Sequence, residues 1–340
     1  MAPTRPARQD RPNASEKRSS RGRVTIHDVA QAAGVSIGTV SRALNDRAGV
    51  NPATRRRVLA VASELAYDPD RAARELSNRR AVTVALSVAH GYRRLTPFFV
   101  LFLQRFHEHL ASSGLRVFEV ASGDDGLPER DADAFVLHGA HPDDPRIAHL
   151  ARLGRPFVLV GHHPGVRCVA PDDEAGGRLA AEHLVRLGHH APLHLSGTPH
   201  AQAFADRARG FAGALAAAGH GPVTTVVADD ITALSAYRAL RAHVEAGARP
   251  SAVFAATDEL AIGCLAAAAD LGLGVPHDLS VVGFDDMPEV GSALTTIRQD
   301  VDALARETVV LLHEALQGDT VRTVRLPVTL VSRGTTAERR

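Results

Sequence analysis

The sequence predicts two kinds of fold in one chain, a small all-α unit followed by a larger α/β part built on parallel sheets. Between residues 24 and 65 the apolar side chains recur at helical spacing, with turn signals between the segments. From residue 82 onward, apolar runs of strand length alternate with longer helical patterns. A length of 340 residues is enough for a small domain and a two-lobed one, each with its own core.

The all-α unit is expected to contain three short helices. Gly34 ends the first segment with a residue that tolerates the backbone of a tight turn, and Ser36 has the side chain of a helix N-cap. Asn51 followed by Pro52 is typical of the start of a helix. The predicted helices cover residues 26–33, 37–45 and about 52–66.

The first two helices divide their side chains between a core face and a polar face. Crossed against each other, they would bury Ile26, Val29, Ala30, Ala33, Val35, Val40 and Leu44. The second helix then presents Ser36, Thr39, Ser41, Arg42 and Asn45. Hydroxyls and amides suit phosphate oxygens, and arginine suits the O6/N7 edge of guanine, so Arg42 is the predicted main base reader. From these residues alone, a helical hairpin with a solvated polar face remains the alternative.

The charge is distributed unevenly along the chain. Residues 1–80 contain 16 Arg and Lys against 8 Asp and Glu, a net charge of +8, whereas the other 260 residues contain 23 against 30, a net charge of −7. A positive excess confined to one end indicates that this end meets a polyanion, which implies nucleic acid.

The α/β part shows seven apolar runs of strand length. In doubly wound sheets of this kind, ligand sites lie at the carboxyl ends of the strands. No period of 20–50 residues repeats, which argues against a solenoid. The predicted strands cover residues 82–89, 115–120, 134–137, 157–160, 192–195, 252–256 and 279–284.

Composition excludes several classes of protein. Two distant cysteines, Cys168 and Cys264, offer neither a disulfide framework nor a thiolate zinc site. Residues 1–23 have no hydrophobic h-region and the later apolar runs are short, so we expect a cytoplasmic protein that is neither exported nor membrane-spanning. The basic stretch 1–23 is predicted to be a disordered tail, either a solubilising leader or an added phosphate contact.

Residues 24–45, VTIHDVAQAAGVSIGTVSRALN, resemble nearly letter for letter the N-terminal signature of the LacI/GalR (lactose-repressor) family. The similarity continues through TRRRVLAVASELAYDPDRAARELS, residues 54–77. The resemblance implies a helix-turn-helix headpiece at 24–69 that reads an operator, a hinge helix within 70–80, and a sensor at 81–340. The DNA contacts it implies are Thr25, Ile26, His27, Ser36, Ile37, Gly38, Thr39, Ser41, Arg42, Asn45, Thr54, Tyr67, Ala73 and Leu76.

Several of these positions have a specific role in the family. Thr54 and Tyr67 match phosphate-contacting positions, and Ile37 and Gly38 stand where the family varies with operator sequence. Leu76, with the small Ala73 beside it, matches the hinge leucine that wedges into the minor groove. A leucine with no core nearby is costly in water but useful between unstacked bases. The alternative is an incidental linker leucine.

The remainder of the chain resembles the family more loosely, over segments such as DRARGFAGAL and LSVVGFDD. The implied sensor is a two-lobed α/β domain like the periplasmic sugar-binding proteins, with crossovers near 173, 300 and 328. Asp and Arg suit polyols through charge-assisted hydrogen bonds, which makes Arg207 and Asp285 the main predicted pair. The full effector-binding set is Phe98, Phe99, Arg207, Ile231, Thr257, Asp258 and Asp285.

Alternatives and departures accompany that set. Asp258 could instead cap the following helix, and one of the two phenylalanines could be core. Where many sugar-responsive members carry an acidic residue, this chain has Gly161, followed by His162 and His163. Between Val120 and Ala134 there is little room for the family's usual helix. Phe, Trp and Tyr make up 4% of the chain, with no Trp, which limits stacking against a sugar.

Neither an enzyme nor an uptake protein fits the sequence well. His107, His109, His189 and His190 lack partners at a metal-ligand spacing and are interpreted as surface or helix-end residues, so no metal, cofactor or catalytic residue is predicted. A solute-binding protein would carry a signal peptide and no helix-turn-helix. We therefore expect a homodimeric transcription regulator, most simply a repressor, that binds a palindromic operator and a sugar or sugar derivative. Whether it represses or activates, and whether the effector induces or corepresses, stays open.

Overall fold

The computed structural model describes residues 26–44, 50–65, 67, 82–89, 96–111, 113–139, 141–197, 201–288 and 293–339. The chain divides into two compact units, Met1–Arg80 and Ala81–Arg340, and each is described by itself. The predicted tail 1–23 and hinge 70–80, with Ala73 and Leu76, lie outside the described residues, as do Thr25 and Asn45. The side chains of Ile26, His27, Ile37 and Ser41 are likewise outside the description.

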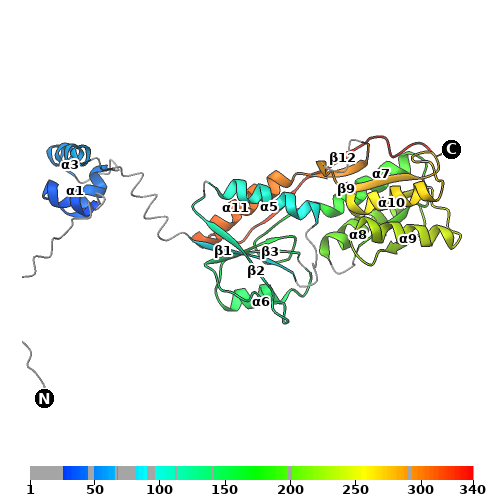
Figure 1. The fold of residues 1–340 in the computed structure, drawn as a ribbon, viewed down its shortest axis with the longest axis horizontal. Helices are drawn as coiled ribbons and strands as arrows, with labels where there is room; N and C mark the ends of the chain where they lie inside the picture. The colour runs from blue at the N-terminus through cyan, green and yellow to red at the C-terminus, as the bar shows by residue number, and fades with distance from the viewer. Residues whose placement is uncertain are drawn as a thin grey trace, which may run out of the picture. The chain divides into compact units, whose positions relative to one another are not determined.

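In its described residues, the first unit contains three helices, α1 (Ile26–Ala33), α2 (Ile37–Leu44) and α3 (Pro52–Glu64), which we call the headpiece. All three predicted helices are present, and their ends differ from the predicted ones by at most two residues (Figure 1). Gly34 has a φ of +63°, which an L side chain would adopt only with strain, so the turn between α1 and α2 depends on glycine. The buried core consists of Val29, Ala30, Ala33, Val40, Ala43, Val58 and Ala62, with Val35 and Leu44 partly buried against it.

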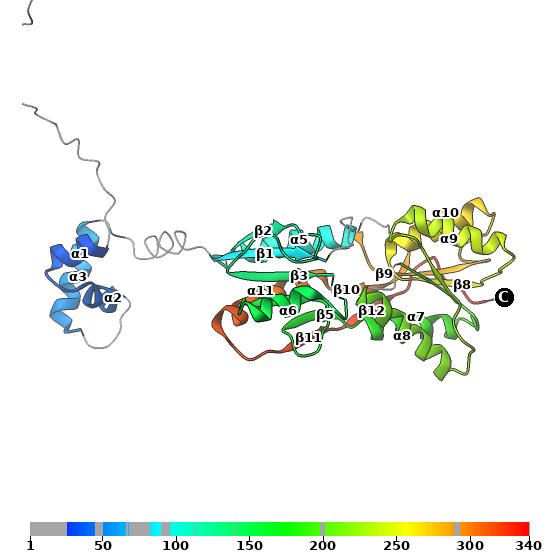
Figure 2. The same ribbon diagram turned by 90° about the horizontal axis from the view of Figure 1, so that it is seen from below.

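The second unit contains two six-stranded sheets with helices on both faces of each, as predicted for a two-lobed α/β domain (Figure 2). We call the part around the first sheet the N-terminal lobe and the part around the second sheet the C-terminal lobe. The strands are β1 (Thr83–Val88), β2 (Arg116–Val120), β3 (Ala134–His138), β4 (Phe157–Val160), β5 (Cys168–Pro171), β6 (Leu193–Ser196), β7 (Thr225–Val227), β8 (Ala252–Ala255), β9 (Ser280–Asp285), β10 (Thr295–Gln299), β11 (Thr323–Leu326) and β12 (Val328–Val331). The helices are α5 (Pro97–Leu110), α6 (Pro145–Arg152), α7 (Asp173–Arg186), α8 (Gln202–Ala217), α9 (Ala233–Glu245), α10 (Asp258–Asp270) and α11 (Val301–Gln317).

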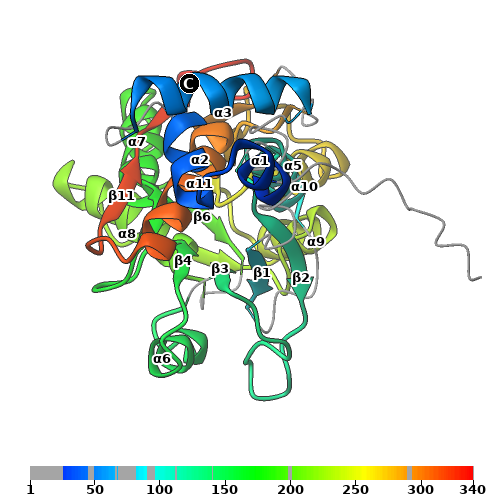
Figure 3. The same cartoon turned by 90° about the vertical axis from the view of Figure 1, so that its left-hand side faces the viewer.

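The sheet of the N-terminal lobe has the strand order β11-β5-β4-β3-β1-β2, and all its pairings are parallel. Helices α5 and α11 cover one face, and α6 lies on the other (Figures 1 and 3). Successive side chains of β3 alternate between these layers: Ala134 and Val136 pack towards α5 and α11, whereas Phe135 and Leu137 pack towards α6. Burial on both faces explains why the strands are near-continuous apolar runs.

The sheet of the C-terminal lobe has the order β12-β10-β9-β8-β6-β7, parallel except for the antiparallel edge strand β12. Helices α7 and α8 lie on one face and α9 and α10 on the other (Figure 2). Strand β8 again alternates, with Val253 and Ala255 in one core layer and Ala252 and Phe254 in the other.

The chain passes between the two lobes three times. The crossings lie between β5 and α7, between β10 and α11, and between β11 and β12. Each crossing begins within a few residues of the carboxyl end of a strand, where doubly wound sheets place their ligands. The crossing segments therefore bring residues far apart in sequence to the boundary between the lobes.

Two features of the second unit differ in detail from the elements that the sequence predicts or add to them. Residues 121–133, between β2 and β3, form turns and one isolated bridge between Ser122 and Pro128 and contain no helix, as their length suggested. Strands β5, β7, β10, β11 and β12 were not among the seven predicted strands. Strand β7 is a short edge strand whose alternate residues are exposed, so it lacks a long apolar run. Among the described helices, none has both the length and the apolar character that crossing a membrane requires.

Candidate functional site

The exposed face of α2 is the candidate nucleic-acid interface of the headpiece. Ser36 precedes α2, and its Oγ accepts a hydrogen bond from the backbone N–H of Thr39 at 3.2 Å, as an N-cap does. The hydroxyls of Ser36 and Thr39 lie 2.9 Å apart. Ser36, Gly38 and Arg42 are exposed, while Thr39 is half-buried. The cap therefore fixes the start of the helix and leaves the polar face open.

Arg42 lies along its own helix. Its Nε donates to the backbone carbonyl of Gly38, one turn earlier, at 3.1 Å. A Cβ at position 38 would lie 3.8 Å from the Nη2 of Arg42, an ordinary van der Waals distance, so the guanidinium lies directly over Gly38 without a clash. The side chain is exposed, and its two Nη groups donate no hydrogen bond to a described residue. Arg42 can thus present a fork of donors to a base edge.

Two further predicted DNA contacts, Thr54 and Tyr67, lie in α3 and shortly after it. Thr54 is half-buried in the first turn of α3, whose N-cap Asn51 accepts from the N–H of Ala53 at 2.8 Å. Tyr67 follows α3 and packs partly buried against the headpiece core. Both positions belong to the same small unit as α2, and their DNA contacts stay predictions.

A cavity of about 230 Å³ lies between the two lobes of the sensor. Both lobes line it at the carboxyl ends of their strands, as expected for doubly wound sheets. Its polar lining comes from Thr96, His138, His162, Asp173, Gln202, Asp206, Arg207, Thr257, Glu259, Asp285 and Gln299. Its apolar lining includes Phe98, Val160, Phe204, Ile231, Ile262, Met287 and Leu304.

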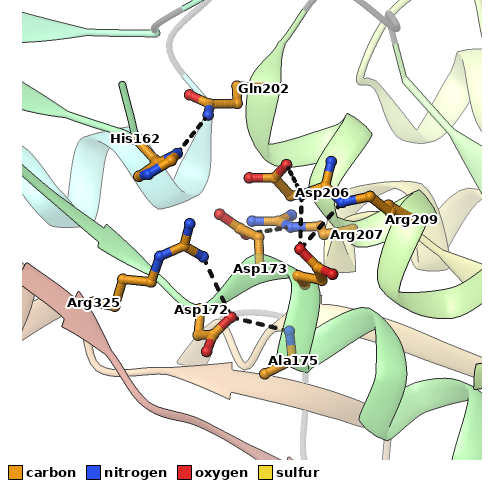
Figure 4. A network of polar contacts seen from close by, with 10 residues as sticks. His162, Asp172, Asp173, Ala175, Gln202, Asp206, Arg207, Arg209 and Arg325 are labelled. Carbon is orange, nitrogen blue, oxygen red and sulfur yellow. Dashed lines mark hydrogen bonds and ion pairs between the residues drawn. The ribbon is translucent and has the colours of Figure 1, made fainter. Parts of the chain in front are cut away.

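Arg207, in the first half of α8, is the centre of the polar network (Figure 4). Its Nε donates to Oδ1 of Asp173 at 2.8 Å, and its Nη1 donates to the carbonyl of Ala256 at 2.6 Å. The guanidinium carbon lies 3.5 Å from the centre of the Phe284 ring. With 6% of its surface exposed, Arg207 is held by one carboxylate, one carbonyl and one ring before any ligand arrives.

Asp285 ends β9 with an unusual backbone. Its φ of 127° lies in a region that L residues rarely adopt, which costs about 1–3 kcal/mol. Gln299, at the end of the neighbouring β10, donates from Nε2 to Oδ1 of Asp285 at 2.6 Å, and Nη1 of Arg207 lies 3.8 Å from the same oxygen. Burial raises the pKa of Asp285 well above its ordinary value despite the nearby Arg207. The carboxyl group is thereby fixed at the cavity wall.

One hydrogen bond joins the two lobes across the cavity. His162 follows β4 in the N-terminal lobe, and Gln202 begins α8 in the C-terminal lobe; Nε2 of Gln202 lies 3.0 Å from Nδ1 of His162 (Figure 4). Burial lowers the pKa of His162, which favours the neutral imidazole as acceptor. His162 stands beside Gly161, where the sequence departs from the family's acidic residue.

A buried ion pair supports the N-terminal wall of the cavity. Nη2 of Arg146 donates to Oδ2 of Asp144 at 2.6 Å, and both side chains are fully enclosed. The same guanidinium donates from Nη1 to the carbonyl of Ser87 and from Nη2 to the carbonyl of His138, at 2.7 and 3.1 Å. It thus ties together the ends of β1 and β3. His138, which lines the cavity, has its pKa lowered to about 3, because it is buried and lies near Arg146.

The structure separates the seven predicted effector residues into two groups. Phe98, Arg207, Ile231, Thr257 and Asp285 line the cavity. Phe99 is 3% exposed and packs in the core with its ring 4.2 Å from that of His138. Asp258 is 1% exposed; it accepts from the hydroxyl of Thr296 at 2.6 Å and from the N–H of Met287 at 2.8 Å. The cap of α10 is Thr257 instead, whose Oγ1 accepts from the N–H of Leu260.

Sequence reasoning did not single out several lining residues. Asp173 is the first residue of α7 and Glu259 the second of α10, so both resemble acids that merely favour a helix N-terminus. Gln299 looks like an ordinary strand residue. Within the described residues, no three His, Cys, Asp or Glu side chains are placed to hold a metal ion. His189 is buried at the end of α7, where it contacts Ser251, Ser280 and the carbonyl of Ala337.

The chain matches known proteins in both of its units. Residues 25–70 match the family described as "Bacterial regulatory proteins, lacI family", and residues 181–336 match the "Periplasmic binding protein-like domain". The HTH-type transcriptional regulator CelR of Thermobifida fusca is 34% identical over 326 residues, which cover 90% of this chain and 96% of that protein.

Two solved structures share the fold over nearly the whole chain. The complex of the transcriptional regulator CelR with cellobiose has a TM-score of 0.67 and 31% identity, covering 92% of this chain and 100% of the other. The Lac repressor dimer bound to operator and the anti-inducer ONPF has a TM-score of 0.68 and 27% identity, covering 93% of this chain and 100% of the other.

Proposed function

The chain belongs to the LacI family of bacterial regulatory proteins, and on that basis we propose that it is a repressor of sugar uptake or catabolism genes that releases its operator when a sugar binds. It is a DNA-binding transcriptional regulator, as its relatives are, and not an enzyme. A bacterial regulator of this kind acts in the cytoplasm, where the operator DNA is.

One observation supports the effector part of the proposal. Arg207 and Asp285, 78 positions apart in sequence, meet at the wall of a cavity that both lobes line. Their charged groups offer hydrogen bonds to hydroxyls from fixed positions. A relative with this fold is known in complex with cellobiose, so we propose that a sugar or sugar derivative occupies this cavity.

The headpiece, residues 24–69, is the proposed operator reader. Arg42 would contact a base edge, and Ser36, Thr39, Thr54 and Tyr67 the phosphates. The positively charged first 80 residues supply the sequence-independent attraction to DNA. Residues 70–80 are the proposed hinge, with Leu76 as the minor-groove wedge and Ala73 beside it. Residues 81–340 are the proposed sensor and dimer surface.

The coupling between the two sites follows from linkage. A twofold dimer places two headpieces on a near-palindromic operator. Ligand binding would change the angle between the lobes, separate the hinges and release the DNA. The sugar must then bind the DNA-free form more tightly, because it shifts the equilibrium only by its difference in affinity for the two forms.

The test is operator binding with and without sugars. Fluorescence anisotropy at fixed salt would follow the purified chain on palindromes from upstream of its own and neighbouring genes, with cellobiose, lactose, galactose, glucose and ribose added one at a time. We expect tight binding to one palindrome and release by one sugar. Binding only after a compound is added would make the protein a corepressor-type regulator, and absence of binding under every condition would reject operator recognition.

A matched pair of variants locates the effector site. Asp285→Asn keeps the shape of the side chain and should weaken release by the sugar while operator affinity stays the same. Asp143→Asn removes an exposed carboxylate in the N-terminal lobe and should change neither. Equal behaviour of the two variants would exclude Asp285 from the effector site.

A further inference from the structure

We propose that the cavity between the lobes selects an uncharged polyol and rejects its phosphorylated or carboxylated counterparts, because its lining carries an excess of carboxylates and an arginine already in use. This inference rests on the proposed function and narrows its effector class.

The charged groups of the lining are unequal in number. Among the described residues that line the cavity, four carry carboxylates, Asp173, Asp206, Glu259 and Asp285, against the one guanidinium of Arg207. An anion entering a site of this composition is repelled, and in a partly enclosed cleft that repulsion is weakly screened. An uncharged ligand avoids the penalty.

Arg207 does not offset that excess for a ligand. Its Nε is bound to Asp173 at 2.8 Å, its Nη1 to the carbonyl of Ala256 at 2.6 Å, and its face to Phe284. A phosphate group is best recognised by a guanidinium that offers two parallel N–H groups. Here Asp173 takes the N–H of Nε and Ala256 takes one N–H of Nη1. At most the Nη1–Nη2 edge of Arg207 remains for a ligand, and the carboxyl group of Asp285 lies 3.8 Å from Nη1.

The balance stays unfavourable to an anion even when the carboxyl groups of Asp173 and Asp285 carry no charge. Burial raises the pKa of both Asp173 and Asp285, which favours their uncharged forms. With Asp173 and Asp285 both uncharged, the carboxylates of Asp206, Glu259 and the neighbouring Glu174 still exceed the guanidinium groups of Arg207 and Arg209 by one charge. The lining histidines add no cation, because burial lowers the pKa of His162 and holds that of His138 at about 3.

The free hydrogen-bonding capacity of the lining also favours a donor-rich ligand. Gln299 uses Nε2 on Asp285, and its buried Oε1 accepts no hydrogen bond from any described residue. A buried acceptor without a partner is costly, and a ligand hydroxyl would satisfy it where a deprotonated oxygen would not.

Two described arginines outside the lining, Arg209 and Arg325, are bound to carboxylates of their own. Arg209 donates to Glu174 at 2.8 Å and to Asp206 at 2.6 Å, and Arg325 lies 3.7 Å from Asp172 (Figure 4). Each of these cations is therefore neutralised locally and offers little attraction to an entering anion.

The test compares matched pairs on the full-length chain by isothermal titration calorimetry. The pairs are ribose and ribose 5-phosphate, glucose and glucose 6-phosphate, galactose and galacturonate, and cellobiose and cellobionate. We expect at least one uncharged sugar to bind, and its anionic partner to bind at least about tenfold more weakly. Raising the salt concentration should narrow that ratio.

A charge-removing variant of a lining residue tests whether charge, and not the shape of the cavity, causes the preference for the uncharged sugar. Glu259→Gln removes one lining charge without changing the size of the side chain and should reduce the preference for the uncharged partner by about tenfold. Glu245→Gln, on α9 and away from the cavity, should leave the ratio unchanged. Three results would each overturn the proposal. An anionic partner could bind as tightly as its uncharged sugar or more tightly, or no uncharged sugar could bind at all. The third is a ratio of the two affinities that stays unchanged in Glu259→Gln.

Anisotropy measurements on the same samples distinguish this inference from the proposed function. If an uncharged sugar binds but fails to release the operator, the inference stands and the repressor mechanism fails. If release occurs with a sugar phosphate and not with the free sugar, the repressor mechanism stands and the inference fails.

Discussion

The contact between α7 and α8 depends on glycines that leave no room for a methyl group. A Cβ at Gly210 would lie 1.9 Å from the carbonyl oxygen of Glu174, and one at Gly177 would lie 2.0 Å from the carbonyl oxygen of Arg207. Favourable contacts between heavy atoms begin near 3.5 Å, and a helix backbone cannot rotate away as a side chain can. Gly210→Ala must therefore push the two helices apart.

A second variant on the same helix, Gly213→Ala, shows how large the loss of stability in Gly210→Ala should be. Alanine favours a helix over glycine by about 1 kcal/mol at any interior position. Gly213, on the same helix, has no atom within 4 Å of its would-be Cβ, so Gly213→Ala should gain that amount. Because the gain is common to both variants, their difference isolates the overpacking cost, about 1–3 kcal/mol.

Urea unfolding followed by circular dichroism would measure the difference. Since α7 carries Asp173 and α8 carries Arg207, joined at 2.8 Å, Gly210→Ala should also weaken sugar binding while Gly213→Ala does not. A Gly210→Ala protein as stable as Gly213→Ala would refute the close packing of these helices.

Three other predictions concern the DNA interface and the sensor core. Arg42→Ala should cost specific operator binding about 1–3 kcal/mol and spare nonspecific binding; equal losses on operator and random DNA would exclude base reading. Leu76→Ala, in the predicted hinge, should weaken operator binding and reduce DNA bending, and unchanged bending in a circular-permutation gel would reject the wedge. Burial lowers the pKa of His194 to about 4, so below about pH 6.5 the unfolded chain binds a proton that the folded chain does not. This residue should therefore lower the unfolding free energy by about 2 kcal/mol from pH 7 to pH 5. His194→Phe, packed between Phe211 and Phe254, should remove that loss and His243→Phe should not; equal pH dependence of the two would contradict the assignment.

The local sequence pattern was enough to predict two kinds of element. These are strands that helices cover on both faces, and helices that begin directly after a capping side chain. Strands β1, β3, β8 and β9 are apolar because helices cover both faces, and α2 and α3 begin at the residues whose side chains cap them. Strand β7 escaped prediction because it lies at a sheet edge and has exposed alternate residues.

The cavity between the lobes was only partly predictable from the sequence. Contacts between residues far apart in the chain decide which side chains line it and which are turned into the core. Asp258 and Thr257 are neighbours, yet one is turned inwards to Thr296, 38 positions away, and the other caps α10. Arg146 and Asp144 resemble a solvated helix start, but the fold encloses them beneath β1 and β3. Partners so distant in sequence leave no local period to detect.

We propose that sugar and operator compete because each favours a different conformation of the protein. Measuring how each ligand changes the affinity for the other tests this competition. Sugar affinity would be measured by titration calorimetry with the free protein and with the protein saturated by its operator. We expect the operator to weaken sugar binding by the same factor by which the sugar weakens operator binding. If the operator left the sugar affinity unchanged or increased it, sugar and operator would not compete.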